Sequence, residues 1–157
     1  MGNSTGVIIK LSILSLLISF GFSFYSPKLK GVKTRAEYVK VLNLQHIEYD
    51  ESPFIENDED RDRYRYYRNV QFEGYPARQV VSFYKDDTID SEMYSFKSWV
   101  VDVDQIAFSS AIFNVFAKMD APKPLQLNDS FKFGDIGEIT VFEPEYMGYK
   151  VAVVFFK

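Results

Sequence analysis

The chain contains no cysteine and only one histidine, His46. A protein without cysteine forms no disulfide, thiolate nucleophile, zinc–thiolate site or lipid-modified cysteine. One histidine cannot build a histidine-based metal cluster, and no GxSxG motif surrounds a serine nucleophile. A serine–histidine–aspartate hydrolase would therefore depend on His46, which we interpret as an isolated surface residue. The sequence also lacks a glycine-rich phosphate-binding loop, and we expect neither a cofactor nor a resident metal ion.

The chain also has no excess of positive charge. Its 18 Lys and Arg residues are outnumbered by 22 Asp and Glu residues, which gives a formal net charge of -4. Nucleic-acid-binding domains usually carry a broad basic surface, so we expect no nucleic-acid partner. Aromatic residues, in contrast, are abundant, with 15 Phe and 11 Tyr among 157 residues. Such large, strand-favouring side chains predict one sheet-rich domain with a well-filled core.

The longest hydrophobic run lies near the N-terminus. Residues Leu11–Phe20 form an apolar run interrupted only by serines, and small residues follow at the two positions that a signal peptidase inspects. We interpret residues 1–23 as a signal peptide. This interpretation predicts a mature chain that begins near Phe24 and a secreted or periplasmic protein.

A membrane anchor is the alternative interpretation of the same segment. The stretch Val7–Tyr25 is just long enough to span a bilayer as a helix. More basic residues follow it than precede it, which would favour a cytoplasmic domain if the segment is retained. Membrane contact is expected only in that case. The basic residues that follow are Lys28, Lys30, Lys33 and Arg35.

Residues 24–33 form a predicted linker, and residues 34–157 form a single predicted α+β domain. Thr34 and Glu37 have the spacing of a capping box, which predicts a short helix at the start of the domain. The stretch 43–60 is rich in acidic residues and contains neither Lys nor Arg. We expect it to be a solvated loop.

The rest of the domain predicts an antiparallel sheet of about five strands with one main helix packed on it. Period-two alternation and turn residues indicate a three-strand meander, and a further pair of strands closes the chain as a hairpin. The main helix between them spans Gln105–Met119 with Asp104 as its N-cap, and we expect it to be largely buried. The predicted strands lie around 70–72 and at 77–85, 89–97, 139–142 and 149–156.

The last strand, Tyr149–Phe156, carries apolar side chains at both odd and even positions. Strands of this kind are normally central and covered on both faces. The main helix would cover one face, so we expect the N-terminal helix or a partner to cover the other. The sheet face is therefore also a candidate contact between copies of the chain.

One stretch of the chain, ENDEDRDRYRYYRN, combines acidic residues with arginines and tyrosines. Asp58, Asp60 and Asp62 have the spacing of the first ligands in an EF-hand loop. The glycine and the closing glutamate of such a loop are replaced by Arg63 and Asn69, so we expect no calcium site. The arginines and tyrosines are suited to phosphates and bases, but Asp62 and the negative domain argue against nucleic acid.

Strand periodicity gives this stretch a simpler interpretation. If Val70 and Phe72 face the core, Tyr64 and Tyr66 lie on the same side of the strand and residues of the opposite parity face outward. Arg68 departs from this pattern and is expected to snorkel or to mark an irregularity. Arginine and tyrosine are enriched at interface hot spots, so we predict a binding surface on the outward side. Its residues are Arg61, Arg63, Arg65 and Tyr67.

These observations favour a non-catalytic domain, exported or membrane-associated, that acts by binding a protein or a glycan. One alternative is a small carboxylate-dependent hydrolase that uses Asp102, Asp104 or neighbouring acids. The simpler interpretation of these acids is structural, with Asp104 as a helix cap and Asp86 and Asp87 in a turn. The other alternative is a membrane-anchored accessory subunit whose basic segment contacts anionic lipid.

Overall fold

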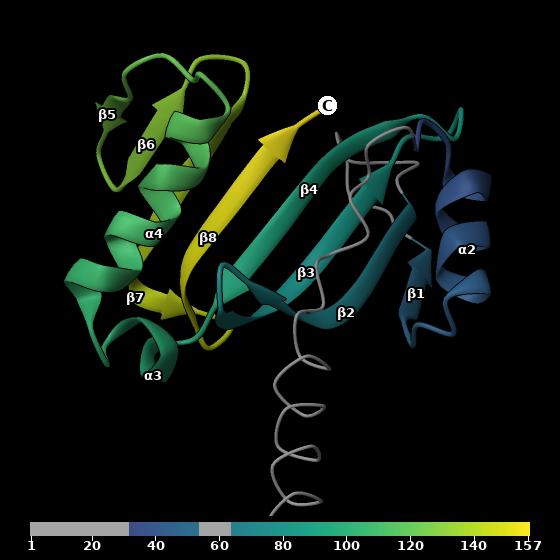
Figure 1. The fold of residues 1–157 in the computed structure, drawn as a ribbon, viewed down its shortest axis with the longest axis horizontal. Coiled ribbons are helices and arrows are strands. Elements are labelled where there is room, and N and C mark those ends of the chain that lie inside the picture. The colour runs from purple at the N-terminus through teal and green to yellow at the C-terminus, as the bar shows by residue number, and fades with distance from the viewer. Residues whose placement is uncertain (1–31, 54–63) are drawn as a thin grey trace, which may run out of the picture.

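The computed structural model describes residues 32–53 and 64–157, which form one eight-stranded antiparallel sheet and three helices. The strand order is β1-β2-β3-β4-β8-β7-β6-β5, so two meanders join where β8 pairs with β4 (Figure 1). The helices are α2 (Arg35–Leu44), α3 (Ser98–Val101) and α4 (Gln105–Lys118). The strands are β1 (Asp50–Pro53), β2 (Tyr64–Phe72), β3 (Tyr75–Phe83), β4 (Ile89–Phe96), β5 (Leu125–Leu127), β6 (Ser130–Phe133), β7 (Gly137–Tyr146) and β8 (Tyr149–Phe156).

The predicted α+β class agrees with this architecture only in its broad sense, because the predicted five strands and single main helix are wrong. β1 forms within the acidic stretch that we expected to be a loop, and its backbone pairs with β2 from Asp50 opposite Tyr67 to Pro53 opposite Tyr64. β5 has three residues, all of them exposed. Short edge strands held by backbone hydrogen bonds need no apolar alternation, which is why the sequence pattern did not reveal them.

The three described helices bury side chains against one face of the sheet, here called the inner face. The buried residues of α2 join a cluster that contains Tyr66 of β2, and those of α3 and α4 join a cluster that contains Val70 of the same strand. Tyr66 and Val70 are both even-numbered, so they lie on the same side of β2. The opposite side is here called the open face. No described helix buries a side chain in a cluster on that face, and α2 and α4 lie at opposite ends of the molecule (Figure 1).

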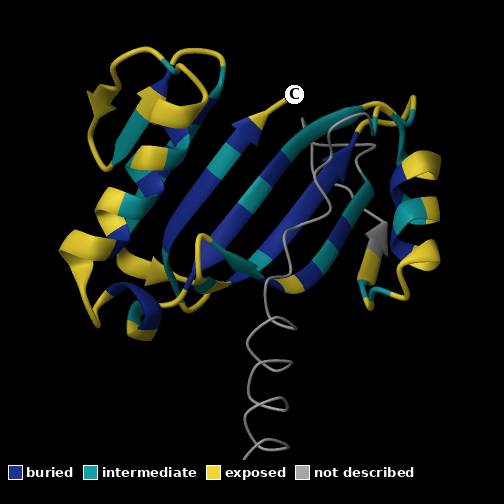
Figure 2. Cartoon of the chain, in the orientation of Figure 1, coloured by how far each residue is buried: buried dark blue, intermediate teal, exposed yellow. Residues whose placement is uncertain are grey.

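Both helix caps predicted from the sequence are confirmed. Thr34 and Glu37 form a reciprocal capping box at the start of α2, and the Asp104 side chain accepts the Ala107 amide hydrogen bond at the start of α4. The prediction that the main helix is largely buried is wrong, because most of its surface is exposed in Figure 2 and Ile106 is 81% exposed. The fully buried residues form one helical stripe, Phe108, Ile112 and Phe116, and the half-buried Phe113 and Val115 also pack against the core.

Buried polar side chains lie between the two hydrophobic clusters on the inner face. Arg68, Gln79 and Glu92 are 6%, 0% and 7% exposed. Gln79 accepts a hydrogen bond from Arg68 Nε and donates through Nε2 to Glu92 at 2.6 Å and to the Tyr94 hydroxyl at 2.9 Å. The prediction that Arg68 snorkels or marks an irregularity is therefore wrong, because Arg68 lies in the regular β2 ladder opposite a buried partner.

β8 is a central strand between β4 and β7, as its apolar composition predicted. Its inward residue Val153 is 0% exposed, whereas Phe156 on the open face is 38% exposed. Among the described residues, no helix is long and apolar enough to cross a membrane. The predicted signal peptide or anchor at residues 1–23 lies outside the described residues, and the domain boundaries stay a prediction.

Candidate functional site

The structure describes two of the four residues predicted to form a binding surface. Arg65 and Tyr67 are half-buried residues of β2. They lie on the open face, because Tyr66 between them is 1% exposed and belongs to the inner cluster. Arg61 and Arg63 lie outside the described residues, as does the acidic run considered for calcium. The predicted parity of the strand is confirmed, whereas the predicted binding role stays a prediction.

Polar side chains continue the open face beyond Tyr67. Backbone pairing places Asn69 of β2, Arg78 of β3 and Ser95 of β4 side by side. Arg78 Nη2 donates to an Asp50 carboxylate oxygen at 3.0 Å, and Nη1 donates to Asn69 Oδ1 at 3.3 Å. The guanidinium carbon also lies 5.5 Å from the centre of the Tyr67 ring. These contacts hold the guanidinium in place while using two of its five N–H donors.

A groove with a volume of about 540 Å³ lies where this polar row meets α3. Trp99, the only tryptophan of the chain, lines the groove and is 63% exposed. Lys97 also lines it, is exposed, and makes no ion pair with any residue that the structure describes. None of the lining residues is Asp or Glu. The other lining residues are Asn69, Val70, Gln71, Pro76, Ala77, Arg78, Ser95, Val100 and Tyr149.

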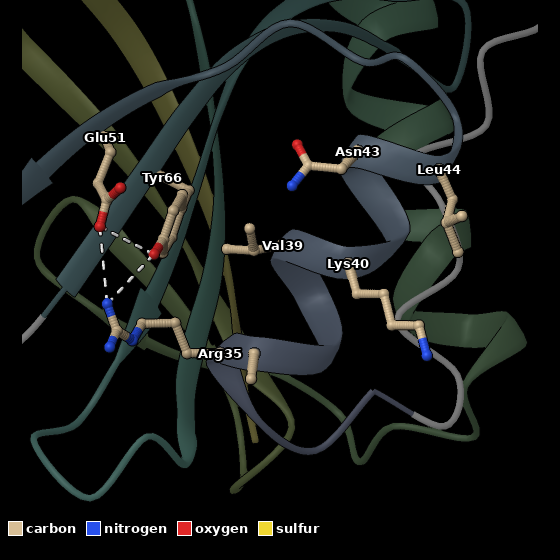
Figure 3. A pocket seen from close by; sticks show the side chains of 8 residues that line it. Arg35, Val39, Lys40, Asn43, Leu44, Glu51 and Tyr66 are labelled. Carbon is tan, nitrogen blue, oxygen red and sulfur yellow. Dashed lines mark hydrogen bonds and ion pairs between the residues drawn. The ribbon is translucent and has the colours of Figure 1, made fainter.

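A second crevice, of about 680 Å³, lies between α2 and the strands β1 and β2. In Figure 3, Arg35, Glu51 and Tyr66 converge on one side of it, whereas Lys40 and Leu44 point away from them. The Tyr66 hydroxyl donates to Glu51 at 3.0 Å, and Arg35 Nη1 lies 3.6 Å from the same carboxylate. The converging groups therefore satisfy one another within the chain.

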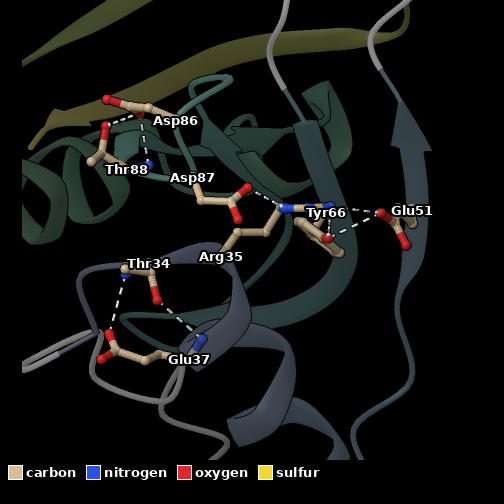
Figure 4. A network of polar contacts seen from close by, with 8 residues as sticks. All are labelled: Thr34, Arg35, Glu37, Glu51, Tyr66, Asp86, Asp87 and Thr88. Carbon is tan, nitrogen blue, oxygen red and sulfur yellow. Dashed lines mark hydrogen bonds and ion pairs between the residues drawn. The ribbon is translucent and has the colours of Figure 1, made fainter.

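Arg35 is the centre of a network that extends beyond this crevice (Figure 4). Its Nε donates to Asp87 at 2.7 Å and its Nη1 to the Tyr66 hydroxyl at 3.5 Å, and the bond to Asp87 raises the pKa of Arg35. Asp87 lies in the predicted turn, where the Thr88 hydroxyl donates to Asp86 at 2.6 Å and lowers the pKa of that carboxyl. Because the network joins α2, β1, β2 and the turn before β4, we interpret it as a structural connection.

Titration of Tyr66 tests this interpretation. Burial, opposed by the Arg35 hydrogen bond and reinforced by Glu51, raises the pKa of Tyr66 to about 12 from 10.0. An absorbance difference between the wild type and Tyr66→Phe is expected to titrate near pH 12. Because the folded protein favours the neutral phenol, the neutral Tyr66 side chain contributes to the free energy of unfolding. This contribution is fully present below pH 10 and is lost as the pH rises through 12. A difference that titrates near pH 10 would show an exposed hydroxyl.

The acids considered for hydrolysis have structural partners. Asp102 accepts hydrogen bonds from Lys150 at 2.5 Å and from Gln105 at 2.9 Å, and the Lys150 bond lowers the pKa of Asp102. A general acid needs a raised pKa instead. Asp104 caps α4. His46 is exposed, as expected, and no group of three or more His, Asp or Glu among the described residues is placed to hold a metal ion.

Comparisons with protein-family models, with curated proteins and with solved structures gave no match. The functional argument therefore rests on the geometry. Sequence reasoning missed Arg78, Lys97 and Trp99, because they join Tyr67 only through the pairing of β2, β3 and β4 and the position of α3. The one available signal was the single tryptophan, and a sequence does not show whether a tryptophan is buried.

Proposed function

We propose that the chain is a non-catalytic binding domain that recognises a protein or a glycan through the open face of its sheet. The observation that supports this most is the groove beside Arg78, where the exposed Trp99, the exposed Lys97 and neutral polar side chains meet. Aromatic and arginine side chains dominate interface hot spots, and an exposed tryptophan leaves a large apolar surface in water. The predicted signal peptide supports a secreted or periplasmic location.

A carboxylate-dependent hydrolase has less support. In the part of the chain that the structure describes, Asp102 is paired with Lys150 and Asp104 caps a helix, so neither is poised to transfer a proton. The groove itself contains no carboxylate.

A membrane-associated accessory subunit is the second candidate, and the exposed apolar side chains at one end of the molecule favour it. There α3 and its C-cap residue Asp102 contact the β7–β8 hairpin through a Ser98–Glu145 hydrogen bond and the Lys150–Asp102 ion pair. Tryptophan and tyrosine are typical of membrane interfaces. The apolar residues of this end are Trp99 (63% exposed), Val103 (85%), Ile106 (81%), Tyr146 (62%) and Met147 (81%).

Photo-cross-linking in the natural host tests the leading proposal. A benzophenone amino acid replaces Tyr67 on the open face, and in the matched control it replaces Ile106, which is 81% exposed on α4. We expect protein or glycan adducts at position 67, with a roughly tenfold lower yield after Trp99→Ala, as loss of a hot spot gives. Equal yields at the two positions, or yields insensitive to Trp99→Ala, would contradict recognition through the groove.

A further inference from the structure

The groove presents positive charge in a chain whose formal net charge is -4. Lys97 and Arg78 both line it, and no carboxylate does. Asp50 contacts Arg78 at 3.0 Å but is not part of the lining. Because the described contacts of Arg78 use two of its five N–H donors, the others remain for a ligand. An anionic ligand suits this groove best.

Neutral hydrogen-bonding groups surround the two cations. The amides of Asn69 and Gln71 and the hydroxyl of Ser95 line the same groove. Amide and hydroxyl groups both donate and accept hydrogen bonds, which matches the donor and acceptor character of sugar hydroxyls. These polar groups come from strands β2 and β4 of a continuous ladder, so the sheet fixes their spacing.

Aromatic rings add a surface for sugar rings. Trp99 is 63% exposed, and the half-buried Tyr149 lines the groove as well. An aromatic face carries partial negative charge, and the axial C–H bonds of a pyranose ring carry partial positive charge, so the two pack against each other. The groove volume of about 540 Å³ is within the range of small-ligand sites.

The sheet topology argues against an extended peptide in this groove. Peptides that bind sheets usually add a strand to an unpaired edge. The groove lies over β2, β3 and β4, and both β3 and β4 have a neighbouring strand on each side. β1 pairs with β2 only from Tyr64 to Tyr67, so β2 is an edge strand beside Asn69 and Gln71. A peptide added to that edge would lie beside β2 in the plane of the sheet, whereas a ligand that lies across the face of β2, β3 and β4 is recognised by side chains.

We propose that the open-face groove binds an anionic oligosaccharide, such as a chain that contains uronic acids. Arg78 and Lys97 would contact the carboxylates, Asn69 and Gln71 the hydroxyls, and Trp99 the face of a sugar ring. This proposal rests on the proposed function and specifies the ligand class of that site.

Fluorescence titration of the full chain in detergent micelles tests the proposal, because Trp99 is the only tryptophan and lines the groove. The probes are an oligogalacturonate, its methyl ester, which lacks the charge, and an oligoglutamate of similar length. We expect the oligogalacturonate to change the Trp99 emission and to bind roughly tenfold more tightly than the ester. Lys97→Met should weaken oligogalacturonate binding by roughly three- to tenfold.

Lys132→Met is the matched control, since Lys132 is an exposed lysine of β6 outside the groove. It should leave the affinity for the oligogalacturonate unchanged. Both lysine variants should have the same melting temperature as the wild type. Equal affinity for the acid and the ester, or a preference for oligoglutamate, would show that the ligand is not an anionic oligosaccharide. The groove would still be a binding site in that case. If none of the three probes changes the Trp99 emission but cross-linked adducts form at position 67, the proposed ligand class is wrong and the proposed binding function stands. If the probes have no effect and no adducts form, the proposed binding function is wrong too.

Discussion

The variant Gln79→Leu is expected to lose about 3–5 kcal/mol of its free energy of unfolding. Gln79 is 0% exposed, and its amide contacts Arg68, Glu92 and Tyr94 at once. Leucine fills a similar volume but can neither donate nor accept a hydrogen bond. Hydrogen bonds to charged groups contribute about 1.5–3 kcal/mol each, and the variant would break two of them within the core.

Urea unfolding followed by circular dichroism measures this loss. The matched control is Gln126→Leu, the same substitution at an exposed position of β5, where a change within about 0.5 kcal/mol is expected. If Gln79→Leu destabilises the protein no more than its control, the buried Arg68 and Glu92 side chains do not depend on the amide of Gln79. They would then be held in place by the packing of the two hydrophobic clusters around them.

Local patterns predicted those elements whose signal lies within a few consecutive residues. The capping box at Thr34 and Glu37 and the cap at Asp104 were predicted correctly, because a cap is a contact between residues three apart. Apolar runs likewise revealed the central strand β8. The edge strands were missed, because β1 reads DESP and β5 reads LQL, and their pairing depends on a neighbour elsewhere in the chain.

Long-range pairing also explains which site residues the sequence could indicate. The parity argument placed Tyr67 correctly on the outward side of β2, because parity is a local property. It misjudged Arg68, whose buried partner Gln79 is eleven residues away and is set opposite it only by the β2–β3 register. The same register brings Arg78 beneath the groove. A charged residue on the apolar face of a strand can thus indicate a buried hydrogen-bond network, and not only an irregularity of the strand.

The variant Phe116→Ala is expected to lose about 3–5 kcal/mol, the usual cost of removing a buried aromatic side chain. Phe116 is 0% exposed and stacks on Phe133 with ring centres 3.9 Å apart and on Phe155 with centres 5.2 Å apart. α4 buries only two other side chains, so Phe116 supplies a large part of the contact between this helix and the sheet. Gly137 lies beneath the Phe116 ring and offers no side chain to fill the cavity.

The matched control for Phe116→Ala is Phe156→Ala, which removes the same side chain from the open face of β8. Phe156 is 38% exposed, and a loss of less than about 1 kcal/mol is expected there. Urea unfolding of the full chain compares the two variants directly. Because neighbouring residues of a strand point to opposite faces, a larger loss for Phe156→Ala would mean that β8 faces the other way. A partner bound to the open face would raise the cost of Phe156→Ala alone, because Phe116 lies on the inner face.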